Sequence, residues 1–236
     1  MSTHTAKIWA IVPAAGHGQR FSVKRPKQFF ELNGKPIAEH SLSRLLAVPS
    51  IEKIIVPSDI SSTLWSQVPS ITHNKIKQVS GGEQRAHSVL NGLLSIKSSA
   101  SDKDWVLVHD IARPCITVED IGQLITAVED HLVGGILVAL VDETLKKVAS
   151  DNHIAATVDR ADHRLAQTPQ IFRYGILKDA IKSCLDKNIL PTDEAFAIES
   201  AGHKVLYVEG RRDNIKITRQ EDLPIASAIL KSQEAK

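Results

Sequence analysis

The stretch that decides the fold is IWAIVPAAGHGQRFSVKRPKQFFEL, residues 8–32. Its first five residues are apolar, small residues and glycines follow at once, and basic residues then arrive at Arg20 and Lys27. An apolar strand that ends in small residues is typical of a parallel sheet, where ligands bind beyond the carboxyl ends of the strands. We therefore expect a ligand site at PAAGHG.

The composition limits the classes of protein to which the chain can belong. Of its 236 residues, 42% are hydrophobic and 24% are charged, which is enough for one or two compact cores. The 29 basic and 27 acidic residues leave a formal net charge of +2, so we expect no nucleic-acid partner. Any anion site must then be local.

Cysteine usage and the N-terminal segment indicate the compartment. Cys115 and Cys184 lie far apart and outside any CxxC pattern, which argues against a disulfide framework or a zinc site. The first apolar run is too short for a membrane span and is unlike a secretory signal. We therefore expect a cytoplasmic protein that has no membrane partner.

Apolar runs of strand length alternate with amphipathic segments. The runs are KIWAIVP, IEKIIVP, KIKQVSGG, DWVLVHD, GGILVAL and HKVLYVEG, in that order. Between them, residues 36–50, 85–99 and 117–132 carry apolar residues at helical spacing. This alternation predicts an α/β fold with a doubly wound, mostly parallel sheet. No repeat or linker divides the chain, so we expect a single domain over residues 1–236.

One segment breaks this rhythm. Residues 141–172 contain two short β-like runs around the turn-rich tetrapeptide SDNH, where another helix would be expected. The pattern predicts a protruding β-hairpin arm at about residues 141–165. Such an arm either packs on a second chain and joins a symmetric dimer, or folds back on its own sheet, and the pattern leaves both open.

The loop after the first run also has two interpretations. Its small residues allow backbone N–H groups to approach phosphates, and Arg20 and Lys27 would add cations, whereas the alternative is a plain strand-to-helix turn. Phe21 replaces the third glycine of the dinucleotide fingerprint, and the Gly-Lys-Ser/Thr of a P-loop is absent. Neither a dehydrogenase nor a P-loop enzyme is favoured.

Two further clusters carry groups suited to nucleotide binding. SGGEQRAHSVLNGL begins with a glycine pair that lets a flat base approach, and Ser88 either hydrogen-bonds the base edge or is solvated. VLVHDIARP places Asp110 at the end of a strand, where a carboxylate near a polyphosphate suits Mg²⁺. Arg113 either receives a substrate phosphate or pairs with Asp110 to order the loop.

The last cluster is EGRRDNIKITRQEDL, residues 209–223. Asp213 and Lys216 lie three apart with apolar residues alternating between and after them, so we expect a short strand that aims both at one cleft. Thr218 is the predicted cap of the helix that follows.

Taken in this order, the motifs resemble those of the 2-C-methyl-D-erythritol 4-phosphate cytidylyltransferases of the non-mevalonate isoprenoid pathway. The matching stretches cover nearly the whole chain and are VPAAGHGQRF, RPKQF, GGEQRAHSV, VHDIARP, TVDR, TPQIF, TDEA and EGRRDNIKIT. The resemblance implies a fold like that of the nucleotide-diphospho-sugar transferases and a homodimer joined through the arm. It also implies transfer of CMP from CTP to 2-C-methyl-D-erythritol 4-phosphate, with Mg²⁺ or another divalent cation as cofactor.

The resemblance further implies a role for each matching residue. The catalytic cations are Arg20, Lys27 and Lys216. The nucleotide-binding residues are Pro13, Ala14, Ala15, Gly16, Gly18, Arg20, Lys27, Gly82, Glu83, Ser88 and Asp110. The residues that bind the polyol phosphate are Arg113, Thr144, Arg160, Thr168, Thr192 and Asp213, and the metal ligands are Asp110 and Asp213. The chain departs from the family pattern at Ile111, Gln84 and His87.

Two alternative functions remain open. Cytidylyltransferases that act on ribitol 5-phosphate resemble the chain closely, and only the pocket for the substrate phosphate would separate the two. A nucleotide-binding regulatory protein without catalysis is the alternative from another class. Retention of Arg20, Lys27 and Lys216 together favours an enzyme.

Overall fold

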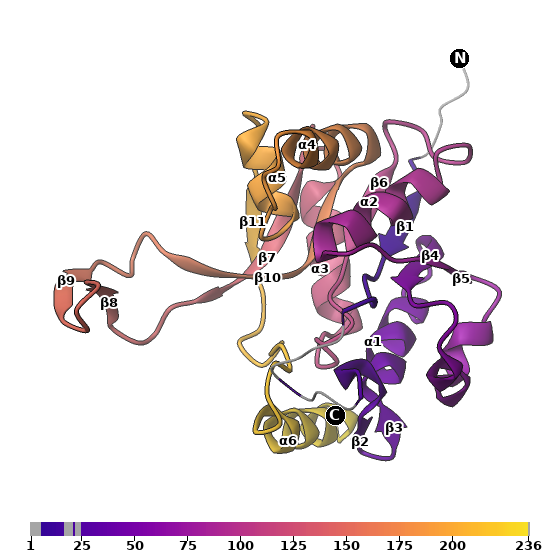
Figure 1. Cartoon of the computed structure of the whole chain (residues 1–236), viewed down its shortest axis with the longest axis horizontal. Coiled ribbons are helices and arrows are strands. Elements are labelled where there is room, and N and C mark those ends of the chain that lie inside the picture. The colour runs from indigo at the N-terminus through magenta and orange to yellow at the C-terminus, as the bar shows by residue number, and fades with distance from the viewer. Residues whose placement is uncertain (1–5, 17–20, 22–24, 236) are drawn as a thin grey trace.

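The architecture comes from a computed structural model that describes residues 6–16, 21 and 25–235. Seven strands form one central sheet in the order β11-β7-β10-β6-β1-β4-β5 (Figure 1). These strands are β1 (Ile8–Ile11), β4 (Ile51–Ser58), β5 (Ile76–Ser80), β6 (Trp105–Val108), β7 (Gly134–Leu140), β10 (Arg164–Arg173) and β11 (Leu206–Glu209). The six predicted runs form all of them except β10, and the prediction of a doubly wound, mostly parallel sheet is confirmed.

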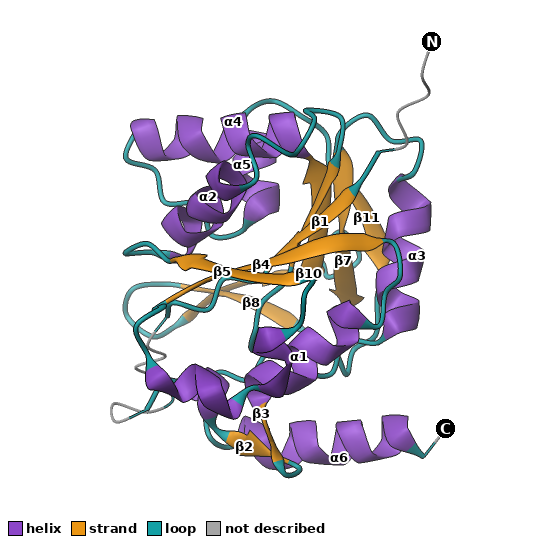
Figure 2. Ribbon diagram, turned by 90° about the vertical axis from the view of Figure 1, so that its right-hand side faces the viewer, coloured by secondary structure: helices purple, strands orange, loops and turns teal. Residues whose placement is uncertain are grey.

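Helices cover both faces of this sheet (Figure 2). They are α1 (Ile37–Leu46), α2 (Arg85–Ser95), α3 (Val118–Val128), α4 (Tyr174–Asp186), α5 (Glu194–Ser200) and α6 (Asp222–Glu234), and the first three lie in the segments predicted to be helical. Alternation along β1 explains the two layers. Ala10 joins the buried cluster of α1 and α3, whereas Trp9 and Ile11 join the cluster of α2, α4 and α5.

A third buried cluster ties the C-terminal helix to the N-terminal part of the chain. α6 packs over a small sheet of β2 (Glu31–Leu32) and β3 (Lys35–Pro36), which follows the 3₁₀ turn η1 (Lys27–Phe29). Leu32 and Leu230 belong to this cluster together with Ile217, the residue after Lys216. Packing of α6 therefore fixes the backbone on which one of the predicted catalytic cations is carried.

The antiparallel strand β10 was not among the predicted runs. It lies between β6 and β7, and Gln170 is paired with Val108 on one side and Ile136 on the other. The middle of β10 carries the polar residues Gln167, Thr168 and Gln170, and all three are buried. Their buried side chains hydrogen-bond to neighbouring loops, so a polar sequence can occupy the middle of the sheet.

The segment predicted to form an arm contains the antiparallel pair β8 (Leu145–Val148) and β9 (Ile154–Val158), which projects from the body in Figure 1. Leu140 of β7 and Arg164 of β10 are paired, so the segment leaves the central sheet and returns to it at one place. Val148 and Ile154 are 67% and 59% exposed. The hairpin therefore does not bury these side chains on its own chain.

Two local predictions near the C-terminus are wrong. Residues 213–217 form a loop in place of the predicted short strand. Among the described residues, the bond from Ile217 N–H to Ala112 O is the one contact there that resembles strand pairing, and a single such bond does not make a strand. Thr218 is not the cap of α6, whose N-cap is Glu221. The direction of the contact is reversed, since the N–H and hydroxyl of Thr218 donate to the Asp222 carboxylate at 2.7 and 3.0 Å.

Cys115 and Cys184 are buried and form no disulfide. Within the described part of the chain, every helix is too short or too polar to cross a bilayer.

Candidate active site

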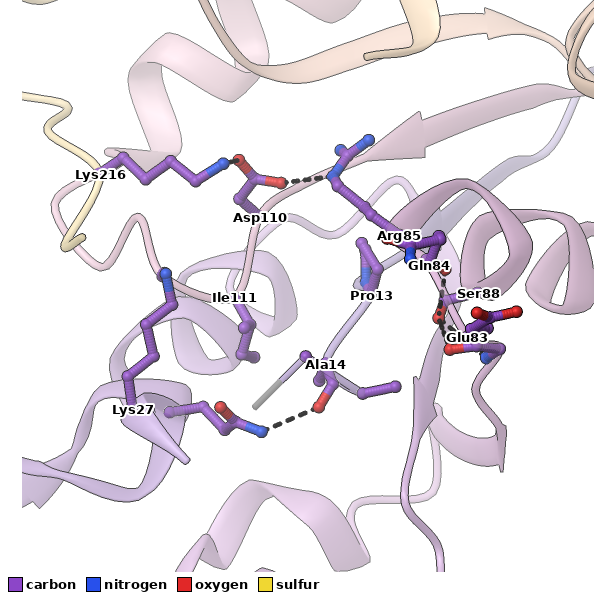
Figure 3. A pocket seen from close by; sticks show the side chains of 15 residues that line it. Pro13, Ala14, Lys27, Glu83, Gln84, Arg85, Ser88, Asp110, Ile111 and Lys216 are labelled. Atoms are coloured by element: carbon purple, nitrogen blue, oxygen red, sulfur yellow. Dashed lines mark hydrogen bonds and ion pairs between the residues drawn. The ribbon is translucent and has the colours of Figure 1, made fainter. Parts of the chain in front are cut away.

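A cavity of about 670 Å³ lies beyond the carboxyl ends of β1 and β6. Figure 3 shows Lys216, Asp110 and Arg85 in a row along one side, with Lys27 and Ser88 on opposite sides below them. The predicted site residues that line this cavity are Pro13, Ala14, Ala15, Gly16, Lys27, Gly82, Glu83, Ser88, Asp110 and Lys216. Ile111 and Gln84 also line it, so two departures from the family pattern face the ligand directly.

Two hydrogen bonds tie the backbone of the first loop to the rest of the fold. Ala14 N–H donates to Pro57 O at 2.8 Å, and Ala14 O accepts from the side chain of Gln28 at 2.9 Å. These bonds hold the loop against β4 and η1 and make Ala14 N–H unavailable to a phosphate. Any cradle of N–H groups must therefore begin at Ala15 or later.

The glycine pair before α2 is required by close packing. A Cβ on Gly81 would lie 2.3 Å from the Cβ of Ala15, and a Cβ on Gly82 would lie 2.4 Å from the Cβ of His87. Ser88 is buried, and its hydroxyl accepts a hydrogen bond of 3.0 Å from Gly82 N–H. Ser88 is therefore not solvated, and it fixes the backbone that a flat base would approach.

Asp110 is the electrostatic centre of the cavity. Its Oδ1 lies 2.9 Å from Arg85 Nε, its Oδ2 lies 2.7 Å from Lys216 Nζ, and Arg113 Nε lies 3.8 Å from Oδ2. Burial by itself raises the pKa of Asp110, but Arg85, Lys216 and Arg113 together lower that pKa well below its usual range. Asp110 is thus a carboxylate that holds three cations around one point.

Arg85 and Glu194 belong to this cluster and were missed at the level of sequence. Arg85 Nη1 and Nη2 donate to Glu194 Oε1 and Oε2 at 2.6 and 3.0 Å, in addition to the bond from Nε to Asp110. Burial would lower the pKa of Arg85, yet Glu194 and Asp110 raise it above its ordinary value. The two residues are 109 positions apart, so no local pattern links them.

Thr168 positions the loop after β6 from inside the protein. Its Oγ1 accepts a hydrogen bond of 3.0 Å from Asp110 N–H and lies 3.2 Å from His109 Nδ1. His109 is completely buried, and that burial lowers its pKa to about 4. A neutral His109 and the Thr168 hydroxyl therefore orient Asp110 from beneath.

Lys27 and Arg113 are both tied to the loop that carries Lys216. Lys27 Nζ donates to Ile217 O at 2.9 Å, and Arg113 Nη1 donates to Asn214 O at 2.8 Å. Asn214 is fully buried and donates to Thr168 O at 2.9 Å. Residues 213–217 thus lack regular structure but are held by contacts on three sides.

Several predicted residues do not line this cavity in the described part of the chain. Asp213 pairs through both carboxylate oxygens with Arg211, and Thr192 is exposed before α5. Thr144 and Arg160 are exposed in the arm segment. Arg113, Thr168 and His87 are also outside the lining, while Gly18 and Arg20 lie outside the described residues.

The described carboxylates do not form a preformed metal site. Both oxygens of Asp110 face cations, and both oxygens of Asp213 face Arg211. No group of three or more His, Cys, Asp or Glu residues is placed to hold a metal ion among residues 6–16, 21 and 25–235. The assignment of Asp110 and Asp213 as metal ligands stays a prediction.

The comparisons with known proteins agree with this geometry. The family model described as 2-C-methyl-D-erythritol 4-phosphate cytidylyltransferase (IspD) matches residues 8–232. The chain belongs to this family.

Curated relatives and a solved structure cover almost the whole length. The 2-C-methyl-D-erythritol 4-phosphate cytidylyltransferase of Tolumonas auensis is 48% identical over 225 residues, which is 95% of this chain and 97% of that protein. The protein of the same name from Hahella chejuensis is 44% identical over 225 residues, 95% of this chain and 93% of its own. The crystal structure of the Francisella tularensis cytidylyltransferase has a TM-score of 0.81 and 37% identity, and the match covers 95% of this chain and 100% of that one.

Membership of the cytidylyltransferase family confirms the resemblance inferred from the motifs. This chain is therefore an enzyme, a nucleotidyltransferase of the cytidylyltransferase kind. The roles of its individual residues are separate questions that rest on the geometry of the cavity.

Proposed function

We propose that the cavity binds CTP and transfers its CMP group to 2-C-methyl-D-erythritol 4-phosphate, giving 4-diphosphocytidyl-2-C-methyl-D-erythritol and pyrophosphate. This proposal rests on one observation. A closely packed glycine turn at Gly82 and the two lysines Lys27 and Lys216 line the same cavity of about 670 Å³. The volume suits a nucleotide, and the two walls match its base and its phosphates. The unpaired state of both cysteines supports placing the reaction in the cytoplasm.

Charge determines the mechanism. A phosphate oxygen of the acceptor attacks the α-phosphorus of CTP, a new P–O bond forms, and the bond to the β-phosphate oxygen breaks as pyrophosphate leaves. Both reactants are anions, so alignment and neutralisation matter more than a general base. Lys27 and Lys216 stabilise the charge that develops on the α-phosphate, and Arg20 is assigned the same role from the family motif.

The nucleotide base lies against the turn formed by Gly82, Glu83 and Ser88. The bond from Gly82 N–H to the buried Ser88 hydroxyl fixes the turn before the base arrives. A pocket made of fixed backbone discriminates by size, so CTP is preferred strongly over ATP and GTP. Comparable turnover with ATP contradicts this assignment.

The requirement for a divalent cation follows from the triphosphate. Because Asp110 and Asp213 are both paired with cationic side chains, the described residues do not fit a resident ion. Mg²⁺ bound to substrate phosphates and water would supply neutralisation of the leaving pyrophosphate. The protein contributes the fixed cations around it.

The acceptor is bound by the arm of a partner chain in a homodimer. Thr144 and Arg160 lie in the exposed segment that projects from the body, whereas the cavity of the same chain is lined by other described residues. The exposed apolar side chains of Val148 and Ile154 need a partner surface. The acceptor site is completed by residues that contact the acceptor directly or hold the loops that form the site: Arg113, Thr168, Thr192 and Asp213.

One assay tests the reaction and its acceptor. Purified protein is incubated with CTP, Mg²⁺ and either 2-C-methyl-D-erythritol 4-phosphate or ribitol 5-phosphate, and release of pyrophosphate is followed. The proposal expects turnover that depends on the first acceptor. Faster turnover with ribitol 5-phosphate identifies the other acceptor, and tight CTP binding without turnover with either acceptor contradicts the proposed transfer.

A further inference from the structure

We propose that Glu194 is a positioning residue for the transfer reaction, which acts through Arg85 and Asp110 to place Lys216. This proposal rests on the function proposed above. Glu194 is the first residue of α5, is 2% exposed and is not among the residues that line the cavity, whereas Arg85, Asp110 and Lys216 all line it. Glu194 therefore contacts the cavity wall through Arg85, whose guanidinium it binds.

The four side chains form one line of alternating charge. Glu194 accepts from Arg85 at 2.6 and 3.0 Å, Arg85 Nε donates to Asp110 Oδ1 at 2.9 Å, and Lys216 Nζ lies 2.7 Å from Asp110 Oδ2. Figure 3 shows the last three of these side chains in sequence along the cavity. The line joins α5, α2, the turn after β6 and the loop before α6.

The end of the line is fixed by the sheet. Asp193 Oδ2 accepts from Gln170 Nε2 at 2.9 Å, and Gln170 Oε1 accepts from Ala195 N–H at 2.9 Å. Gln170 is on β10 in the middle of the central sheet. Glu194 therefore lies between two residues that are hydrogen-bonded to Gln170 of this strand, so the backbone that carries its carboxylate is held in place.

Competition for Asp110 explains why Glu194 is needed. A guanidinium binds a carboxylate best in a two-pronged arrangement, and the prongs Nη1 and Nη2 of Arg85 are held by Glu194. Arg85 is therefore left with Nε for Asp110, which keeps Oδ2 open to Lys216. Without the charge on Glu194, the partly buried Arg85 takes both oxygens of Asp110, and Lys216 loses its anchor.

A double-mutant cycle tests this mechanism. Glu194→Gln, Lys216→Ala and the double variant are compared in kcat and KM for CTP and acceptor. We expect Glu194→Gln to lower kcat about 10-fold with a change in the KM for CTP of less than about threefold. The double variant should be no slower than Lys216→Ala alone, because the loss caused by the first substitution is a loss of Lys216 placement. Losses that multiply in the double variant overturn the proposal.

Matched variants separate positioning from folding. Glu199→Gln changes an exposed residue of the same helix and should leave kcat unchanged. Glu194→Asp retains the charge and should recover part of the kcat lost in Glu194→Gln, whereas equal losses in the two variants contradict the mechanism. If Glu194→Gln does not fold, Arg85→Lys replaces it in the cycle, with the same expectation toward Lys216→Ala. An inactive wild-type protein overturns the proposed function as well, whereas an active one with multiplying losses overturns only the role of Glu194.

Discussion

Lys27 Nζ donates a hydrogen bond of 2.9 Å to the carbonyl oxygen of Ile217, the neighbour of Lys216. Lys27 and Lys216 are 189 residues apart in sequence, yet this bond places both on one wall of the cavity. A triphosphate that enters the cavity thus meets two cations whose spacing is set before binding. Such preorganisation is the main source of electrostatic catalysis.

Lys27→Ala tests this arrangement. The variant should lose about 10²–10³ in kcat while the KM for CTP changes much less, because Lys27 acts mainly on charge that develops in the transition state. Pyrophosphate release under saturating substrates gives the measurement. Lys35→Ala, which removes an exposed lysine of β3, is the control and should keep full activity. A Lys27→Ala enzyme with wild-type kcat removes Lys27 from the mechanism.

Arg160→Ala tests the arm. The variant should raise the KM for the acceptor while leaving the KM for CTP nearly unchanged, because Arg160 lies in the projecting segment and is assigned to one substrate only. Initial rates at varied concentrations of each substrate provide the measurement. An equal increase in both KM values contradicts this division of roles.

Mixed dimers decide whether the arm acts on the neighbouring subunit. Arg160→Ala subunits retain an intact CTP cavity, and Lys27→Ala subunits retain an intact arm. If each site combines the cavity of one chain with the arm of the other, mixing the two variants should restore one working site per mixed dimer. Exchange of subunits is verified by native mass spectrometry. Absence of recovered activity after verified exchange assigns the arm to its own subunit.

Gly81→Ala should raise the KM for CTP, whereas Gly122→Ala should stabilise the folded protein. The added Cβ at Gly81 meets the Cβ of Ala15 at 2.3 Å, so the nucleotide turn must shift and the KM for CTP should rise about 10-fold or more. Gly122 lies in α3 with nothing within 4 Å of an added Cβ, and its substitution should stabilise the protein by about 0.5–1 kcal/mol. Initial rates and urea unfolding measure the two effects, and a wild-type KM for CTP in Gly81→Ala contradicts the close packing.

Cys115 should make stability fall at alkaline pH. Burial, followed by the nearby Asp213, raises the pKa of this thiol to about 12. The unfolded thiol ionises near pH 8.5, so between these two values the unfolded state releases a proton that the folded state retains, and stability falls as pH rises. From pH 8 to pH 10 the free energy of unfolding should fall by about 2 kcal/mol from this group alone.

Cys115→Ser isolates that contribution, because serine does not titrate in this range and retains a donor toward Ala226 O. Urea unfolding of the wild type and the variant at pH 8 and pH 10 gives four free energies. The wild type should lose about 2 kcal/mol more than the variant between the two pH values. Equal losses mean that the thiol is as acidic in the folded protein as in the unfolded chain.

The sequence alone was sufficient for the parallel part of the sheet but not for its antiparallel strand. The runs that form β1, β6 and β7 are continuous and apolar because these strands are covered by helices on both faces, as Trp9 and Ala10 illustrate by joining opposite clusters. The strand β10 carries Gln167, Thr168 and Gln170 in buried positions, where hydrogen bonds to distant loops compensate for their polarity. Such compensation depends on tertiary contacts and leaves no local signal.

The same distinction holds for the cavity. Gly82 and Lys27 stand in motifs whose local pattern indicates a ligand site, and both line it. Asp213 and Lys216 were expected to face one cleft from a short strand, but the loop turns Asp213 to Arg211. Glu194 reaches the site through a partner 109 residues away, so its importance is invisible until the chain is folded.

The pairing of Leu140 with Arg164 makes the arm a modular insertion. Both ends of the segment emerge from adjacent strands of the same ladder, so its length and its tip sequence can diverge while the register from Gln170 onward stays fixed by β6 and β7. The segment can therefore be exchanged as a unit without changing the strands that position the cavity. If the arm binds the acceptor as proposed, such an exchange would change the acceptor and leave nucleotide binding intact. This architecture predicts that a chimeric enzyme carrying the hairpin of a relative between Leu140 and Arg164 will fold with the same central sheet.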